Sequence, residues 1–210
     1  MPKGDAYAQN VQYPLLSDVP NIETALSTLV NGVVPLTVMR FANANARAAA
    51  LSGNVKPVPG MITYLTAEDR WEGRQADGTW LLLSDGPWQP LSYKTGYAAN
   101  GGSPGWRKKA GGGIELRGRI QRSNSASLTD DGSLVPFASI PASVAPATSR
   151  YYITPSKRIT ADGVTRYTAR VEVQSDGTLT YTVENGGGVS TSGSPGWFGL
   201  DGVMFSPAGD

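Results

Sequence analysis

The residues best suited to acid-base catalysis in this sequence are two groups of carboxylates. Glu68, Asp69 and Glu72 form one group, and Asp130 and Asp131 form the other. Two carboxylates can serve as general acid and as base or nucleophile in glycoside hydrolysis. Both groups fall in segments expected to form turns, where charged side chains are normally solvated. We therefore predict that neither group is catalytic and that the protein is not an enzyme.

The chain lacks the residues on which most other enzyme and metal sites depend. Its 210 residues include no His and no Cys. This composition excludes a Ser-His-Asp triad, a thiol nucleophile, a disulfide, and His or thiolate ligands for a metal. Phosphate-binding Gly-x-x-x-x-Gly-Lys, dinucleotide-binding Gly-x-Gly-x-x-Gly and Ser-x-x-Lys patterns are also missing. We predict no metal and no cofactor.

Aromatic side chains are the main candidates for binding. A flat ring with a polar edge suits the face of a sugar. The rings that fall near predicted loops are Trp88, Trp106, Trp197, Tyr151 and Tyr152. We consider them for binding a surface glycan, with packing in the core as the alternative for most of them.

A five-residue segment with a Trp at its end occurs twice. Gly102-Ser103-Pro104-Gly105-Trp106 is repeated as Gly193-Ser194-Pro195-Gly196-Trp197. We interpret the two copies as similar loops that seat a Trp at the end of a strand. The alternative is a platform for a ligand.

The net charge of the chain is too small to attract a polyanion. Eighteen Lys and Arg balance seventeen Asp and Glu, for a net charge of +1, so we expect no nucleic-acid binding. One local cluster stands out, which we expect to be a solvated strand face, or else a contact for an anionic polymer or an acidic partner subunit. Its members are Arg107, Lys108, Lys109, Arg117, Arg119 and Arg122, with the single acid Glu115 among them.

Signals for membranes and secretion are also missing. No apolar run approaches the roughly 20 residues that span a bilayer, so we expect no membrane insertion. Residues 1–5 lack the apolar core of a secretory signal. We therefore expect synthesis and assembly in a cytoplasm.

The elements that would position these residues fall into three predicted zones, 1–55, 56–85 and 86–210. The first begins with an arm of about 19 residues, either floppy or lying along a partner. A heptad-like stripe follows, and Pro20 and Asn21 suit the start of a short helix. A second, Ala-rich helix is expected within 41–51. Both helices pack either on their own chain or around a symmetry axis. The stripe comprises Ile22, Leu26, Leu29, Val33 and Leu36.

Strands dominate the other two zones. Residues 57–83 predict three short strands with a turn at Asp77-Gly78, a meander too small to fold without a neighbouring surface. From 86 onward, strands alternate between apolar and polar residues, as at 114–121 and in the hairpin around Asp176-Gly177. The spacing favours an antiparallel β-sandwich of the jelly-roll type. The whole chain is predicted to be mainly β with short N-terminal helices.

Three segments resemble virion proteins of tailed phages that infect actinobacteria. Residues 38–48 contain Arg-Phe-Ala-x-x-x-x-Arg, residues 60–65 read Gly-Met-Ile-Thr-Tyr-Leu, and residues 77–80 read Asp-Gly-Thr-Trp. Residues 197–205 are similar to the last strand of the distal domains of such proteins. The resemblance is good over about 38–83 and looser afterwards. It implies a homotrimeric tail fibre, baseplate or receptor-binding protein with an N-terminal anchor and a C-terminal tip.

The leading hypothesis is therefore a trimeric structural protein of the virion tail. Its N-terminal arm would bind other virion proteins, and its tip would bind host cell-wall polysaccharide. The alternatives are a capsid or neck decoration protein that binds only virion subunits, and a small glycan depolymerase. The predicted trimer interface consists of Ile22, Leu26, Leu29, Val33, Met39 and Phe41.

Overall fold

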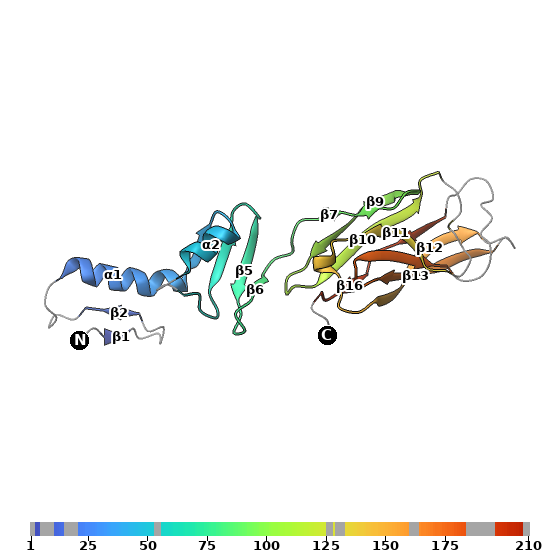
Figure 1. Ribbon diagram of the computed structural model, residues 1–210. Helices are drawn as coiled ribbons and strands as arrows, with labels where there is room; N and C mark the ends of the chain where they lie inside the picture. The colour runs from blue at the N-terminus through green and yellow to red at the C-terminus, as the bar shows by residue number, and fades with distance from the viewer. Residues whose placement is uncertain are drawn as a thin grey trace. The chain divides into compact units, whose positions relative to one another are not determined.

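The computed structural model describes residues 3–4, 11–14, 21–52, 56–124, 128, 133–159, 164–183 and 196–207. The chain divides into two compact units, Met1–Ser84 and Asp85–Asp210 (Figure 1). Strands outnumber helices among the described residues, which confirms the predicted mainly β class. The first two predicted zones lie in the first unit, except for Asp85, which begins the second.

The first unit begins with two very short strands and the predicted helix. β1 (Lys3–Gly4) pairs antiparallel with β2 (Gln12–Tyr13), and most of the predicted arm lies outside the described residues. α1 (Ile22–Val33) is a helix of three turns, as predicted. It starts where the Asn21 side chain accepts a hydrogen bond from Thr24 N at 2.9 Å. The 3₁₀ turn η1 (Val34–Leu36) follows it.

A small four-stranded sheet with one short helix completes the first unit. Its order is β3 (Val38–Phe41), β4 (Ile62–Leu65), β5 (Arg70–Arg74) and β6 (Trp80–Leu82). The three meander strands are confirmed. Their missing neighbour is β3, which pairs parallel to β4.

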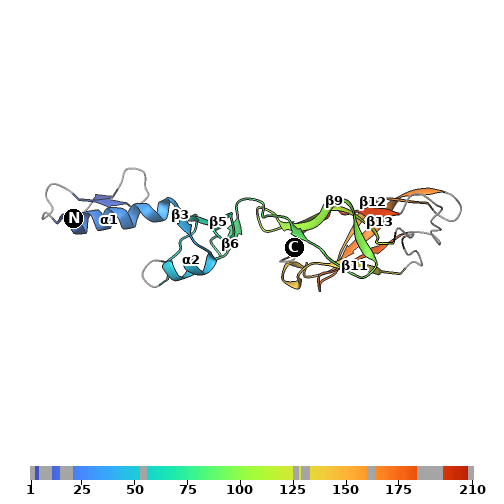
Figure 2. The same cartoon turned by 90° about the horizontal axis from the view of Figure 1, so that it is seen from above.

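The second predicted helix is shorter than expected. α2 (Ala44–Ala50) begins after the Asn43 cap, whose side chain accepts from Ala46 N at 2.8 Å. Phe41 belongs to β3 instead of the helix. Figure 2 shows α2 at one side of the small sheet.

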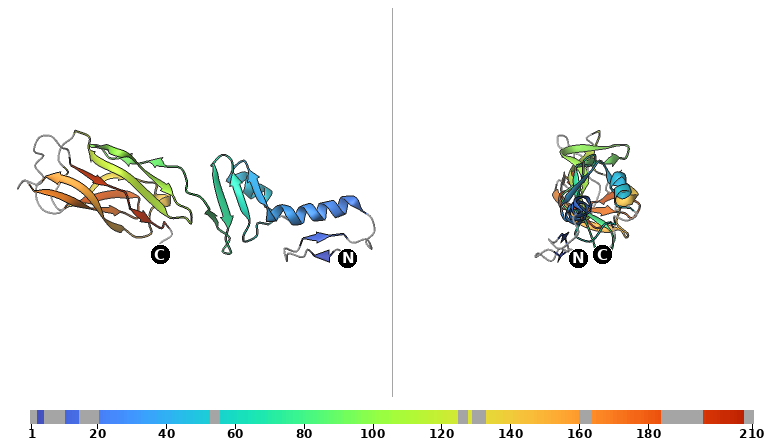
Figure 3. Two further views of the ribbon diagram at one scale, coloured as in Figure 1. Left: turned by 180° about the vertical axis from the view of Figure 1, so that it is seen from behind. Right: turned by 90° about the vertical axis from the view of Figure 1, so that its left-hand side faces the viewer.

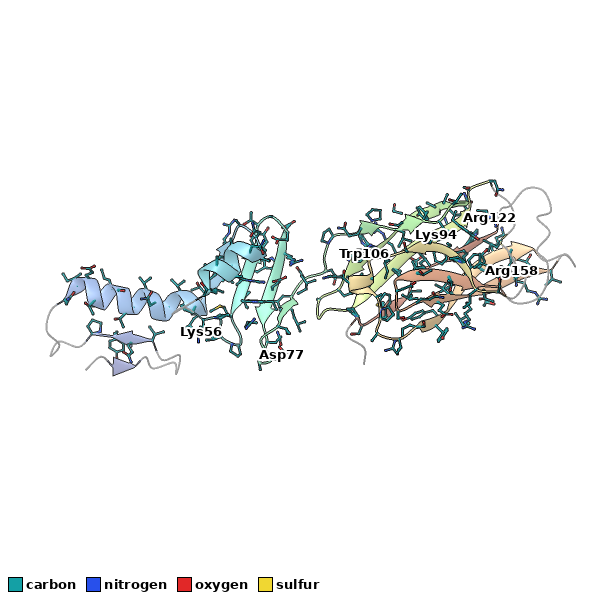
Figure 4. The ribbon with its side chains drawn as sticks, in the orientation of Figure 1. Lys56, Asp77, Lys94, Trp106, Arg122 and Arg158 are labelled. Atoms are coloured by element: carbon teal, nitrogen blue, oxygen red, sulfur yellow. The ribbon has the colours of Figure 1, made fainter. Side chains whose placement is uncertain are left out.

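Two predicted Asp-Gly turns are confirmed and are built in the same way. Asp77 accepts hydrogen bonds from the backbone and hydroxyl of Thr79, and Asp176 does the same with Thr178. The backbone hydrogen bonds are the main reason that the pKa of both carboxyl groups lies below its usual value. Figure 4 labels Asp77 at the edge of the small sheet.

The second unit is one long sheet that curls until it is nearly closed, like a barrel (Figure 3). Its strands run in the order β7-β9-β10-β15-β12-β13-β14-β11-β8, and β16 also pairs with β10. The first and last strands of this order are neighbours in the chain, joined by the buried Leu91. The strands are β7 (Gln89–Pro90), β8 (Ser92–Tyr93), β9 (Tyr97–Lys108), β10 (Ile114–Arg122), β11 (Val135–Ser139), β12 (Arg150–Ile159), β13 (Thr165–Val173), β14 (Thr178–Thr182), β15 (Trp197–Gly199) and β16 (Met204–Phe205), and the 3₁₀ turn η2 is Ala142–Val144.

Packed aromatic rings fill the interior of this sheet. The Phe198 ring centroid lies 4.8 Å from that of Phe137 and 4.7 Å from that of Tyr181. The hydroxyl groups of Tyr97 and Tyr181 are 3.1 Å apart, so each polar end has a partner inside the core. The predicted alternation of β10 is confirmed, because Ile114, Leu116 and Ile120 are buried with these rings.

The antiparallel pair of β9 and β10 contains a β-bulge, where the two backbones approach closely. The first Gly-Ser-Pro-Gly-Trp copy lies inside strand β9, so its interpretation as a loop was wrong. Gly118 has φ +91°, and a Cβ there would lie 2.5 Å from Pro104 Cα. The pairing shifts its register across this position, between Arg117 and Arg119, and again between Arg119 and Ile120. Only glycine leaves room for Pro104 here.

We expect Gly118→Ala to destabilise the second unit by about 2–5 kcal/mol, because a left-handed backbone and a steric clash add together. Gly111→Ala is the matched control, since Gly111 also has positive φ but faces open space. It should lose only about 1–2 kcal/mol. Denaturant unfolding of the full chain measures both, and equal losses would contradict the packing described at Pro104.

Candidate functional site

The Arg47 side chain joins α2 to the small sheet. It is 6% exposed, and its Nη1 donates to Thr63 Oγ1 at 3.0 Å and to Glu72 Oε2. Arg70 Nε lies 2.8 Å from the other Glu72 oxygen. The Arg47 guanidinium carbon lies 3.9 Å from the centre of the Trp80 ring. Because buried charges need partners, these contacts hold α2 on this face of the sheet.

Two of the segments that carry the phage resemblance meet at this contact. Arg47 ends the Arg-Phe-Ala-x-x-x-x-Arg segment, and Trp80 ends Asp-Gly-Thr-Trp. Their stacking gives both segments a structural role in the first unit.

The carboxylates considered for catalysis have structural contacts where the structure describes them. Glu68 accepts from Ala44 N at 3.1 Å, at the start of α2. Asp69 accepts from the Tyr64 hydroxyl at 2.5 Å, and this hydrogen bond raises the pKa of Tyr64. Glu72 is buried within β5, so its predicted place in a turn was wrong. Asp130 and Asp131 lie outside the described residues.

The face of the small sheet away from α2 carries exposed apolar side chains. We call it the open sheet face. Trp71 is 42% exposed, and Leu83 is 48% exposed. The Tyr64 and Trp71 ring centroids are 5.1 Å apart, and a surface pocket lies beside them, lined also by Val38 and Arg40. The register places on this face Val38, Arg40, Ile62, Tyr64, Trp71, Leu81 and Leu83.

Sequence reasoning missed the open sheet face, although a signal was present. Residues 80–83 read Trp-Leu-Leu-Leu, which places apolar side chains on both faces of one strand. Such runs are typical of strands that are covered on both sides. Here α2 packs against one side, and the other side remains exposed in the isolated chain.

The predicted trimer interface lies partly on an exposed helix. None of the residues of α1 is buried. Ile22 is 76% exposed and Leu26 56%, while Leu29 and Val33 are also exposed. By the register of β3 and β4, Met39 and Phe41 lie on the opposite side of β3 from Val38 and Arg40, and both are half-buried. The stripe and the open sheet face are therefore the main apolar surfaces of this unit.

Three of the five candidate glycan-binding rings are engaged within the second unit. Trp88 is half-buried, with the Arg117 and Arg107 guanidinium carbons 4.0 and 4.6 Å from its centre. Trp106 packs against the core, as does Tyr152, whose hydroxyl donates to Met204 O at 2.7 Å. These contacts leave little ring surface for a ligand.

The other two rings are on the outer surface of the sheet, each beside one arginine. Tyr151 is 59% exposed, and the Arg170 guanidinium carbon is 4.5 Å from its centre. Trp197 is half-buried, with the Arg119 guanidinium carbon at 5.2 Å. The five rings do not converge on one site. Trp106 lies toward one end of the second unit, whereas Trp197 lies opposite Gln121, near Arg122 at the other end (Figure 4).

Some cations of the basic cluster at 107–122 form ion pairs with carboxylates, and Arg119 differs from them. Arg107 lies 2.9 Å from Asp85 and 2.8 Å from Glu115. Lys109 also contacts Asp85 at 2.9 Å, which raises the pKa of Lys109, while hydrogen bonds from Ala110 N and Lys109 lower that of Asp85. Among the described residues, no carboxylate forms an ion pair with Arg119.

Comparisons of the chain with protein-family models, curated proteins and solved structures found no match. Within the described segments, none of the helices has both the length and the apolar character needed to cross a membrane.

We expect Arg47→Met to destabilise the first unit by about 3–5 kcal/mol, because it removes the buried partner of Glu72 and leaves only the partly exposed Arg70 beside that carboxylate. The double variant Arg47→Met, Glu72→Leu should be less destabilised than the single variant. Lys56→Met, which alters an exposed cation, is the control and should change stability by about 0.5 kcal/mol or less. The measurement is denaturant unfolding at one fixed protein concentration. A double variant that loses the sum of two large single effects would contradict the pairing.

Proposed function

We propose that this protein is a structural virion component, a homotrimer in the tail fibre or baseplate of a phage. The observation that carries the proposal is the exposed apolar stripe of α1, a helix with no buried residue. An isolated helix of 12 residues is marginal in water, because the first turn is costly to form. A helix of this kind is stabilised when its apolar side is covered by another surface.

A second surface of the same unit supports self-assembly. Burial of one large aliphatic or aromatic side chain contributes about 1.5–3 kcal/mol, and the open sheet face exposes several of them. Copies of the chain that cover both the stripe and this face would recover that stability without disulfides. A trimer agrees with the resemblance to tail proteins and with the heptad-like spacing of the stripe.

In this proposal, residues 1–55 and the open sheet face assemble the trimer. Residues 1–55 also attach it to other tail proteins, while residues 86–210 form the tip. The curled sheet of the second unit would be a jelly-roll-like sandwich. Its outer surface would face the host cell wall. The exposed ring of Tyr151 and the half-buried ring of Trp197, both on the outer surface of the sheet, support glycan contact. Such contacts are weak individually, but several copies on one particle multiply them.

One observation favours the decoration protein as a second candidate. Ile153 is 71% exposed on β12 and lies on the same face as Tyr151, two residues away. An exposed aliphatic side chain beside an aromatic one suits contact with another protein subunit. Such a protein would bind virion subunits and no bacterial surface.

We expect Leu26→Asp to dissociate the assembly, because it places a charge in the apolar stripe of α1. Ser27→Asp is the control, since Ser27 is exposed one position away from the stripe. Sedimentation velocity should show a smaller species for Leu26→Asp and an unchanged one for Ser27→Asp. If Leu26→Asp leaves the wild-type sedimentation unchanged, α1 does not form the interface.

We expect the labelled full chain to bind saturably to bacterial strains that adsorb the virion and not to resistant strains. Unlabelled chain should compete for the same sites, and flow cytometry measures both effects. Binding to purified virion subunits with none to any sensitive strain would instead favour the decoration protein.

A further inference from the structure

A row of three side chains crosses the outer face of the second unit around Trp197. Trp197 on β15 lies opposite Gln121 of β10 on one side and opposite Lys157 of β12 on the other. The adjacent row of Ile120, Phe198 and Ser156 is buried. Because successive side chains of a strand point to opposite faces, the row of Trp197 faces outward.

Two further side chains complete what we call the Trp197 platform. The Arg119 guanidinium carbon lies 5.2 Å from the ring centre of Trp197. Asn100 Nδ2 donates to Gln121 Oε1 at 2.5 Å, which leaves the Gln121 amide NH₂ directed elsewhere as a donor. The platform thus combines one ring, two amides and two cations, Arg119 and Lys157.

Within the part of the chain that the structure describes, no acidic side chain neutralises the positive charge of this platform. Both Arg119 and Lys157 are exposed, and no carboxylate of the described residues pairs with either of them. At the other end of β10, Arg107 and Lys109 share Asp85 and Glu115. Among the described residues, the cations Arg107 and Lys109 thus have acidic partners, whereas Arg119 and Lys157 have none.

We propose that the Trp197 platform binds an anionic saccharide unit of a cell-wall polymer. The apolar face of the sugar would lie on the Trp197 ring, and the Gln121 amide would bond to a hydroxyl group. Arg119 and Lys157 would bind its phosphate or carboxylate group, since charge-assisted hydrogen bonds are the stronger ones. This inference rests on the proposed host-binding function and names its ligand class.

The composition of the platform favours a glycan over a second copy of this chain. Its members around the ring are polar or charged, unlike the aliphatic side chains of α1 and the open sheet face. A core protein–protein contact is depleted in charged residues. A saccharide, in contrast, offers both an apolar face and many hydrogen-bonding groups.

The test is a titration of the full chain with three polymers: poly(glycerol phosphate) teichoic acid, polygalacturonate and neutral dextran. We expect binding to at least one anionic polymer, weakening with salt, and none to dextran. The teichoic acid and polygalacturonate arms distinguish phosphate from carboxylate. Equal binding of dextran would overturn the inference.

Point variants test whether the binding occurs at the Trp197 platform. Trp197→Ala and Lys157→Gln should each weaken binding about fivefold or more, the size expected for one ring or one cation contact. Lys108→Gln is the matched control, because Lys108 is also exposed in the second unit and unpaired among the described residues. Equal effects of Lys157→Gln and Lys108→Gln would overturn the inference. Unfolding midpoints confirm that each variant is folded.

Two further measurements, of oligomeric mass and of binding to cells, distinguish a failure of this inference from a failure of the proposed function. If Trp197→Ala changes the oligomeric mass, the platform is a contact between copies and the inference is wrong. If the chain binds sensitive cells but neither anionic polymer, the inference fails while the proposed function stands. If it binds no sensitive strain, the host-binding function itself fails.

Discussion

The ion pair of Arg47 and Glu72 determines which side of the small sheet receives α2. Because its charged groups are buried, the helix must sit where Arg47 reaches both Glu72 and Thr63. That choice leaves Val38, Ile62, Trp71 and the neighbouring leucines on the other side. The same contact that completes one face of the sheet therefore leaves the second face exposed. Together with the stripe of α1, this face is the physical reason for expecting assembly.

The two units bury their apolar side chains in different ways. The second unit curls its sheet around a closed cluster of aromatic and aliphatic side chains, so its interior is complete within one chain. The first unit has one short helix against one face of four short strands. Below about 70–80 residues, a single hydrophobic core rarely contributes more than about 3–5 kcal/mol without staples or partners. The small sheet and its helix lie within residues 38–83, and this chain has no cysteine.

Local features of the fold could be predicted from the sequence, while distant pairings could not. The cap at Asn21 and the two Asp-Gly turns follow from side chains that bond to nearby backbone. The parallel pairing of β3 with β4 joins segments that carry no mutual signal. The Trp197 candidate was found from its residue type, but Arg119, Gln121 and Lys157 come beside it only through the register of three strands. The bulge at Gly118 likewise depends on Pro104, which lies on the neighbouring strand.

We propose that the first unit is stable only in an assembly of three copies. Native mass spectrometry of the full-length wild-type protein, repeated across a range of concentrations, tests it most directly. We expect a species of about 66 kDa, three times the chain mass of 22.1 kDa, that persists at low micromolar concentration. A folded, monodisperse species of 22.1 kDa at every concentration would contradict it.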